Sequence, residues 1–245
     1  MLRIKNLKKY FGGVKAVDDA SFEINKNQIT GLIGPNGAGK STIFNIISGF
    51  EKEDSGKVYF EKKDITSLSP EKKAREGISR VFQKSRLFDN LSVYENLLVS
   101  IDEENTNFFK SLIKKNKISK EHKEEIDKTL HLFEIEHIKN HKCSDLSFGQ
   151  KRLVEFARAV IRPHKLLILD EPVAGVSPQL RNKIMDILKK LKRNGETILL
   201  IEHDMIFTFN ICDKIFVLEK GKVIASGTPA QIKNNKKVLE AYLGD

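Results

Sequence analysis

The stretch that most constrains the fold of this chain is Ile29 to Gly49, ITGLIGPNGAGKSTIFNIISG. It combines a short apolar strand, a glycine-rich loop and a helix, and the loop, Gly34 to Ser41, matches the phosphate-binding pattern G-x-x-x-x-G-K-S/T. Glycines let the backbone wrap closely around a ligand, so that successive N–H groups form an anion-binding nest. The helix that follows directs its positive end at the same anion. The stretch predicts a site for the phosphates of a nucleoside triphosphate; the alternative is a glycine-rich turn that binds nothing.

Two side chains of the loop predict the ligands. Lys40 brings a compact positive charge to the β and γ phosphates, and the hydroxyl of Ser41 is placed to ligate Mg²⁺. We therefore expect ATP and Mg²⁺ to bind here. The nucleotide-binding residues predicted from this loop are Gly34, Pro35, Asn36, Gly37, Ala38, Gly39, Lys40, Ser41 and Thr42.

Strands and helices alternate along the chain, which predicts an α/β fold. Leu166 to Leu169 and Thr197 to Ile201 are expected to be buried strands that do not alternate with polar residues, typical of a mostly parallel sheet that is covered on both faces. Ala20 to Ile24 alternates between apolar and polar side chains, as a half-exposed strand does. We expect an antiparallel β portion at the N-terminus, ahead of a P-loop nucleoside-triphosphatase core.

A helical insert is predicted after the first part of the core. Glycine is missing from residues 84–142, where lysine, glutamate and asparagine dominate, and Ile126, Leu130 and Phe133 recur at helical spacing. Asp102 to Asn107 is expected to be its exposed loop. We expect a single domain over residues 1–245, in which residues 1–83 and 164–245 form the nucleotide-binding core with its β portion and residues 84–163 form a helical subdomain.

Composition and charge limit which binding partners and which cellular compartment we expect. The formal net charge of +10 is compatible with binding to nucleic acid, but the lysines are spread along the chain and do not interleave with aromatic residues, so a solvated lysine-rich surface is favoured. There is no apolar run of about eighteen residues and no signal-peptide pattern at the N-terminus. The two cysteines, Cys143 and Cys212, are isolated. We expect a cytoplasmic protein with free thiols.

Polar side chains at the ends of predicted strands point to hydrolysis. The carboxyl ends of parallel strands meet at one edge of the sheet, where ligands bind. Asp170 ends an apolar strand and is expected to face Mg²⁺ through a water molecule, and Glu171 is expected to act as the base for an attacking water. His203 and Gln83 end two further strands. We expect His203 to bond the γ-phosphate or the water, and Gln83 to reach the metal and the water.

These residues carry a resemblance to the ATPase subunits of ABC transporters. The phosphate loop, VFQ at 81–83, LSFGQ at 146–150, LLILDEP at 166–172 and IEHD at 201–204 occur in the order and approximate spacing of that family. The resemblance covers essentially the whole chain. It implies that two subunits close head to tail around two ATP molecules, and that the cycle drives transmembrane permease subunits from the cytoplasmic face of the membrane.

The resemblance also implies roles for two further groups of residues. The signature of one subunit would cap the γ-phosphate held by the other, and Phe11, with Tyr10 as the second candidate, would stack on the adenine. From the residues alone, core packing of that aromatic pair is the favoured alternative. The signature residues are Leu146, Ser147, Phe148, Gly149 and Gln150.

Two departures from the family pattern narrow the resemblance. Phe148 stands where glycine is common, and Ser177 stands where many members carry an aspartate that bonds across the dimer. With EPVAGVSP, GKVIASGTP and the ending LEAYLG, the chain most resembles the ATPase of branched-chain amino acid importers, and next the lipopolysaccharide-export ATPase. A soluble ABC ATPase acting on nucleic acid or ribosomes, and a subunit that binds nucleotide without hydrolysing it, are the weaker alternatives.

Overall fold

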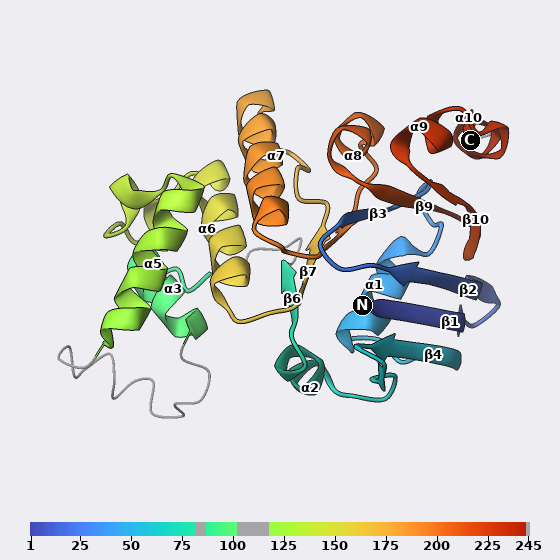
Figure 1. The fold of residues 1–245 in the computed structure, drawn as a ribbon, viewed down its shortest axis with the longest axis horizontal. Helices are drawn as coiled ribbons and strands as arrows, with labels where there is room; N and C mark the ends of the chain where they lie inside the picture. The colour runs from blue at the N-terminus through green and yellow to red at the C-terminus, as the bar shows by residue number, and fades with distance from the viewer. Residues whose placement is uncertain (82–86, 102–117, 244–245) are drawn as a thin grey trace.

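The computed structural model describes residues 1–81, 87–101 and 118–243. Within these residues the strands form two sheets, one in the order β10-β9-β3-β8-β7-β6 and the other in the order β2-β1-β4-β5 (Figure 1). The strands are β1 (Leu2–Phe11), β2 (Val14–Ile24), β3 (Ile29–Ile33), β4 (Ser55–Phe60), β5 (Lys63–Asp64), β6 (Ile78–Val81), β7 (Leu166–Asp170), β8 (Ile198–Ile201), β9 (Lys214–Glu219) and β10 (Lys222–Gly227).

The larger sheet confirms the predicted α/β fold with a mostly parallel sheet. Strand β3 runs parallel to both β8 and β9, and β7 runs parallel to both β6 and β8. The β9–β10 pair is antiparallel. Every residue of β3, β7 and β8 is buried. The carboxyl ends of β3, β7 and β8 therefore lie next to one another at one edge of the sheet.

The uninterrupted apolar strands are explained by two cores, one on each face of this sheet. Along β7, Leu167 and Leu169 belong to one core, which includes helices of the chain's second half. Leu166 and Ile168 point into the other core, which lies between this sheet, α1 (Lys40–Ser48) and the antiparallel sheet. Both faces of the strand are covered, so neither face tolerates polar side chains.

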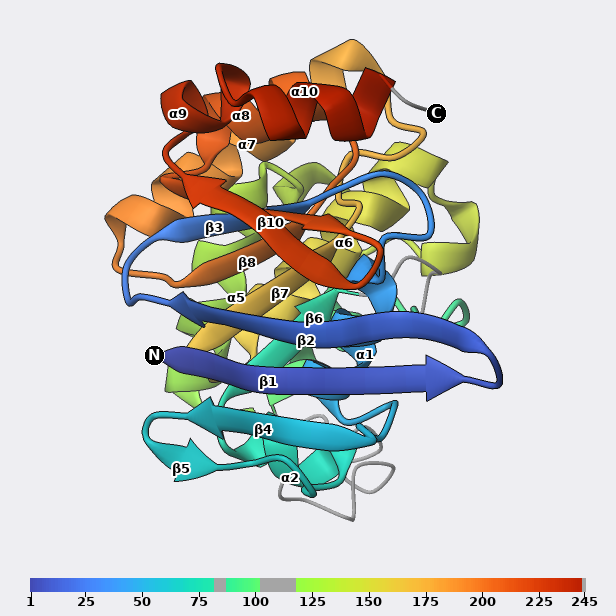
Figure 2. The ribbon, with the colours of Figure 1, turned by 90° about the vertical axis from the view of Figure 1, so that its right-hand side faces the viewer.

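The smaller sheet is the antiparallel β portion that the N-terminal residues predict. Strand β1 pairs antiparallel with β2 on one side and with β4 on the other. Its inward side chains, which include Leu2, Ile4 and Leu7, are buried against α1. Figure 2 views this sheet face on, with the larger sheet behind it. The β1–β2 hairpin brings the Ala16 carbonyl next to Gly39 of the glycine-rich loop.

A group of helices stands to one side of the sheets in Figure 1. It contains α3 (Val93–Ile101), α5 (Lys120–Phe133) and α6 (Phe148–Ile161), which pack on one another. The predicted helical spacing is confirmed, because Ile126, Leu130 and Phe133 are all fully buried. The exposed loop predicted at 102–107 lies outside the described residues. The division of the chain at residues 83 and 163 stays a proposal.

The remaining helices lie between strands or follow the last strand. The helices are α2 (Pro70–Arg75), the short 3-10 turns η1 (Glu136–Ile138) and η2 (Cys143–Asp145), α7 (Pro178–Arg193), α8 (Met205–Ile211), α9 (Pro229–Lys233) and α10 (Lys236–Leu243). Helix α8 was not predicted, because MIFTFNI is too short and too uniformly apolar to show helical periodicity. Its start is set by Asp204, whose carboxylate accepts a hydrogen bond from the Phe207 N–H at 2.9 Å.

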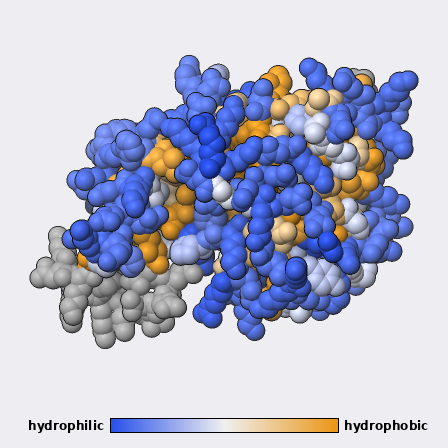
Figure 3. All heavy atoms as spheres, viewed as in Figure 1, coloured by the Kyte–Doolittle hydropathy of each residue, from blue (hydrophilic) through white to orange (hydrophobic). Residues whose placement is uncertain are grey.

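The surface matches the polar composition. The face in Figure 3 is mostly hydrophilic, with smaller hydrophobic areas among the helices. Within the part of the chain that the structure describes, no helix is both long enough and apolar enough to span a bilayer.

Candidate functional site

The glycine-rich loop is held tightly between two other parts of the fold. Gly39, which precedes α1, has φ +100°, and a Cβ atom there would lie 2.0 Å from the Ala16 carbonyl oxygen. A Cβ atom at Gly34 would lie 2.0 Å from the Leu218 carbonyl oxygen. No residue except glycine fits such spaces without moving the backbone. The loop is therefore clamped between the β1–β2 hairpin and β9, with its backbone wrapped around the start of α1.

Lys40 occupies the centre of this loop. Its side chain is buried, and Nζ donates to the carbonyl oxygens of Gly34 at 2.6 Å and Pro35 at 2.8 Å. Burial lowers the pKa of the Lys40 ammonium, and the carboxylates of Glu171 and Asp170 oppose that shift. Nζ bridges two carbonyl oxygens of its own loop. An incoming phosphate would draw Nζ away from these carbonyls.

The other predicted loop residues differ in exposure. Asn36, Gly37 and Ser41 are exposed to solvent, whereas Ala38 is buried against the core. Pro35 and Thr42 are half-buried. The exposed groups lie where a ligand can reach them, which is compatible with a bound phosphate chain.

Asp170 lies at the end of β7 and is paired with an arginine that sequence reasoning missed. The Asp170 Oδ2 atom is 3.4 Å from Arg80 Nη2, with each side chain 12% exposed. Arg80 also donates to Asn45 Oδ1 at 2.9 Å, and its guanidinium lies over the Phe44 ring, both on α1. Burial raises the pKa of Asp170, while Arg80 favours the carboxylate. Arg80 therefore helps keep Asp170 charged at the sheet edge where a cation is expected.

Glu171 and His203 meet at the same edge, as the strand ends predict. The Glu171 Oε1 atom lies 3.6 Å from His203 Nδ1. Glu171 has φ +47°, an uncommon backbone conformation for a non-glycine residue, and its N–H donates to the Ile201 carbonyl at 2.9 Å. The Glu171 and His203 side chains are 28% and 58% exposed. Both can therefore reach a water molecule or a phosphate that approaches the loop.

Glu202, a residue that the sequence analysis passed over, fixes the backbone beside His203. Its side chain is fully buried, and its carboxylate accepts hydrogen bonds from the N–H groups of Val173, His203 and Asp204, at 3.2, 3.2 and 3.3 Å. Burial raises its pKa, against the effect of these N–H donors. Glu202 thus ties the segment after β8 to the segment after β7.

Arg152, on α6, is a second arginine that sequence reasoning missed. It is buried and donates to the backbone carbonyl oxygens of Asp170 at 3.3 Å, Glu171 at 3.0 Å and Pro172 at 3.3 Å. Its Nη1 atom also lies 3.2 Å from Glu155 Oε2. Arg152 therefore connects the helix of the LSFGQ segment to the backbone that carries Asp170 and Glu171.

We expect Arg152→Ala to lower the free energy of unfolding by about 3–5 kcal/mol, because it removes the ion-pair partner of the largely buried Glu155 and the donor to three backbone carbonyls. Urea denaturation measures the change. Arg3→Ala is the matched control, since Arg3 pairs with Glu23 on the surface and should contribute less than about 1 kcal/mol. Equal losses in the two variants would contradict the structural role of Arg152.

The LSFGQ segment forms the start of α6. Ser147 caps the helix: the Gln150 N–H donates to Ser147 Oγ at 3.3 Å, and the Ser147 N–H donates to Gln150 Oε1 at 2.9 Å. Leu146 is buried and Phe148 is exposed. A Cβ atom at Gly149 would lie 2.9 Å from Leu180 Cδ2 on α7. The segment thus presents Ser147 and Phe148 to solvent at a helix N-terminus, as capping of a partner's phosphate would require.

Ser177 has a local role that does not depend on a partner. Its hydroxyl accepts a hydrogen bond from the Leu180 N–H at 3.3 Å and caps α7, with Pro178 at the first helical position. Serine is among the best residues at such a position, so the departure from aspartate preserves the helix start.

Phe11 and Tyr10 lie at the tip of the β1–β2 hairpin. Phe11 is 47% exposed, so for this ring the alternative of core packing is wrong. Tyr10 is half-buried, and its hydroxyl donates to Asp18 Oδ1 at 3.0 Å. Lys9 Nζ lies 5.0 Å from the centroid of the Phe11 ring. An exposed ring near the loop is available for stacking, and its contact with adenine stays a prediction.

The residues fit a magnesium ion that is held partly by phosphate. Among the described residues, no group of three or more His, Cys, Asp or Glu side chains is arranged to hold a metal. Mg²⁺ commonly binds through one or two protein ligands together with substrate phosphates, so a site made of protein ligands alone is not required. Ser41 and Asp170 are the described candidates at this edge. Gln83, the third, lies outside the described residues.

The chain is similar to proteins of known family along its whole length. The family model for "ABC transporter" matches residues 17–174, and the model for "Branched-chain amino acid ATP-binding cassette transporter" matches residues 222–245. A probable branched-chain amino acid transport ATP-binding protein LivG of Methanocaldococcus jannaschii is 41% identical, with 100% of this chain and 98% of the relative covered. The lipopolysaccharide export system ATP-binding protein LptB of Haemophilus influenzae is 36% identical, with the same coverage.

Solved structures agree with these relatives. The crystal structure of a nucleotide-free ATP-binding cassette from an ABC transporter has a TM-score of 0.84 and 40% identity, covering 100% of this chain and 99% of that one. A dimeric structure of a bacterial ABC transporter cassette has a TM-score of 0.79 and 28% identity, covering 94% and 99%.

Proposed function

This chain belongs to the ABC transporter family as one of its ATPases, and from this premise we propose that it powers a complex that imports branched-chain amino acids. Two similarities support branched-chain amino acids as the transported substrate, one to a family model and one to a full-length relative. A family model named for branched-chain amino acid transport matches the C-terminal residues 222–245, and a LivG relative is 41% identical over the full chain. Lipopolysaccharide export is the second candidate, supported by the LptB relative at 36% identity.

The chemistry proposed for the site follows from its geometry. Glu171 would orient or deprotonate the attacking water, because its carboxylate is reachable from solvent and lies beside His203. Lys40 would leave the Gly34 and Pro35 carbonyls to bind the phosphates. Ser41, Asp170 and Gln83 would hold Mg²⁺. When bound, Mg²⁺ neutralises charge on the phosphate oxygens.

We propose that the active form contains two such ATPase subunits, which are either identical or different. A related cassette has a dimeric structure. In this chain the signature residues lie at the start of α6, where Ser147 and Phe148 are exposed. One subunit thus offers its exposed Ser147 and Phe148 to a partner's nucleotide. Permease subunits would tie the pair to the cytoplasmic face of a membrane, and no direct contact with nucleic acid is expected.

The substrate proposal is tested on the assembled complex. We expect the chain to copurify with permease subunits, and leucine, isoleucine or valine, delivered by the complex's own solute-binding component, to stimulate ATP hydrolysis in the reconstituted complex. Glutamate, delivered in the same way, is the control and should not stimulate. Stimulation by lipopolysaccharide and not by these amino acids would contradict amino acid import and favour lipopolysaccharide export. Copurification with ribosomes and not with membranes would favour the soluble ABC ATPase.

A further inference from the structure

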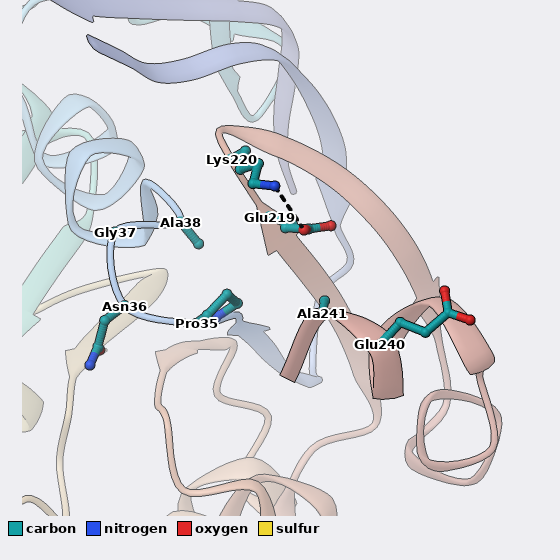
Figure 4. Close-up of a pocket in the computed structure, with 8 residues that line it drawn as sticks. All are labelled: Pro35, Asn36, Gly37, Ala38, Glu219, Lys220, Glu240 and Ala241. Atoms are coloured by element: carbon teal, nitrogen blue, oxygen red, sulfur yellow. Dashed lines mark ion pairs between the residues drawn. The ribbon is translucent and has the colours of Figure 1, made fainter. Parts of the chain in front are cut away.

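The carboxylates beside the phosphate loop and the strand ends fall into two kinds by their exposure. Glu219 and Glu240 are of the first kind, and with Pro35 to Ala38 they line a cavity of about 270 Å³ beside the loop, as Figure 4 shows. Glu219 is 31% exposed and lies 3.8 Å from Lys220 Nζ. Ion pairs as exposed as this one contribute little to a fold. Glu202, which follows β8, is of the other kind, because its side chain is completely buried.

The Glu202 carboxylate accepts hydrogen bonds from the backbone of two segments. Its Oε1 atom accepts from the Val173 N–H at 3.2 Å, in the segment after β7. Its Oε2 atom accepts from the N–H groups of His203 at 3.2 Å and Asp204 at 3.3 Å, in the segment after β8. A glutamine has a single acceptor oxygen and would turn its NH2 group toward one of the two segments. A carboxylate can therefore serve both segments at once, and an amide cannot.

Each of these segments carries a residue that we propose to act in hydrolysis. Val173 lies in the turn that begins at Glu171, where the Ala174 N–H donates to the Glu171 carbonyl at 3.2 Å. His203 is the next residue after Glu202, and its Nδ1 atom is 3.6 Å from Glu171 Oε1 and 3.9 Å from Glu202 Oε2. Glu202 therefore bonds the backbone close to both of the side chains that meet at this edge of the sheet.

The segment after β8 is also fastened on the other side of His203. Asp204 caps α8 by accepting the Phe207 N–H at 2.9 Å, and its carboxylate pairs with Arg181 of α7 at 2.9 Å. The His203 side chain, in contrast, is 58% exposed. The backbone of His203 is thus held through both of its neighbours while its imidazole stays accessible. This arrangement suits a group that must meet a bound phosphate or a water molecule in one geometry.

We propose that Glu202 is a positioning residue for ATP hydrolysis, and that its buried carboxylate sets the place of His203 relative to Glu171. This role rests on the proposed function, in which Glu171 and His203 act on the bound ATP and the attacking water. Misplacing a catalytic group by about 1 Å can slow a reaction about 10²-fold. Loss of the Glu202 carboxylate should therefore slow turnover and leave the phosphate contacts of Lys40 in place.

The test compares Glu202→Gln with the wild type and with Thr197→Val. Thr197 precedes β8 and is 3% exposed, and its hydroxyl accepts the Asn27 N–H at 3.0 Å, so the control removes a buried acceptor at the opposite end of the same strand. We expect Glu202→Gln to lower kcat about 10- to 100-fold with KM for ATP within about twofold of the wild type. Thr197→Val should lower the melting temperature and leave kcat unchanged. Equal kcat in the two variants would overturn the inference.

A double-mutant cycle with His203→Ala separates positioning from a general structural effect. Once the imidazole is gone, its place relative to Glu171 no longer matters. Adding Glu202→Gln to His203→Ala should therefore lower kcat by less than about twofold further, whereas independent effects would multiply. If Glu202→Gln turns over like the wild type while His203→Ala is slow, the inference alone is wrong. If His203→Ala also turns over normally, the proposed assignment of His203 to hydrolysis has failed as well.

Glu202→Asp is the second variant, for use where glutamine prevents folding. Aspartate keeps the charge and both oxygens but is one methylene shorter, so from the same backbone position it cannot bond both segments. We expect kcat to fall with KM for ATP unchanged, and this fall should disappear in the His203→Ala background. Wild-type turnover in folded Glu202→Asp would contradict the positioning role.

Discussion

Glu171→Gln is expected to bind ATP as the wild type does and to hydrolyse it about 10²- to 10⁴-fold more slowly, the usual contribution of a general base. Glutamine keeps the size of the side chain and its hydrogen-bonding capacity, but its amide cannot accept a proton from water. Steady-state phosphate release measures hydrolysis, and equilibrium binding measures affinity. Because ATP would hold two subunits together until hydrolysis, size-exclusion chromatography with ATP should also show a trapped dimer.

Glu134→Gln is the matched control for that variant. Glu134 also has a positive φ, +54°, and its carboxylate pairs with Lys183 at 3.0 Å, but it lies at the end of α5. The control therefore loses one carboxylate from an equally unusual backbone position that is remote from the site. It should hydrolyse ATP at the wild-type rate. Normal turnover in Glu171→Gln would show that another group activates the water, and His203, 3.6 Å away, would be the next residue to examine.

Local patterns were sufficient to predict the elements that position the site. The phosphate loop and the buried strand that leads to Asp170 and Glu171 each follow from residues that are close in sequence. Gly39 is an example, because its φ of +100° is one that glycine adopts without strain. The order of the strands in the sheet then brings their carboxyl ends together.

The residues that support the site could not be predicted in the same way. Arg80 and Arg152 matter because of partners far away in sequence: Arg80 pairs with Asp170, and Arg152 with the carbonyls around Glu171. An arginine on a strand or a helix carries no local mark of such a partner. These contacts depend on tertiary packing, which the hydrophobic periodicity of the sequence does not predict.

Lys40→Ala is expected to raise the ATP dissociation constant about 10- to 100-fold, because a hydrogen bond to a charged group contributes about 1.5–3 kcal/mol. Lys73→Met is the matched control. Lys73 is also a buried lysine whose Nζ donates to a backbone carbonyl, that of Ile46 near the end of α1, at 2.7 Å. Burial lowers its pKa to about 8, so it too is a desolvated ammonium.

The two lysine variants should separate an effect on ATP affinity from an effect on folding stability. Lys73→Met removes a buried donor on the side of α1 away from the nucleotide, so it should change the melting temperature and leave ATP affinity unchanged. Lys40→Ala should mainly lower the affinity for ATP and change the melting temperature less, because in the protein alone its Nζ contacts carbonyls of the loop. Titration with ATP and thermal unfolding without it measure the two quantities. If both variants lose affinity equally, the loss reflects the stability of α1, and the direct contact between Lys40 and the phosphates is refuted.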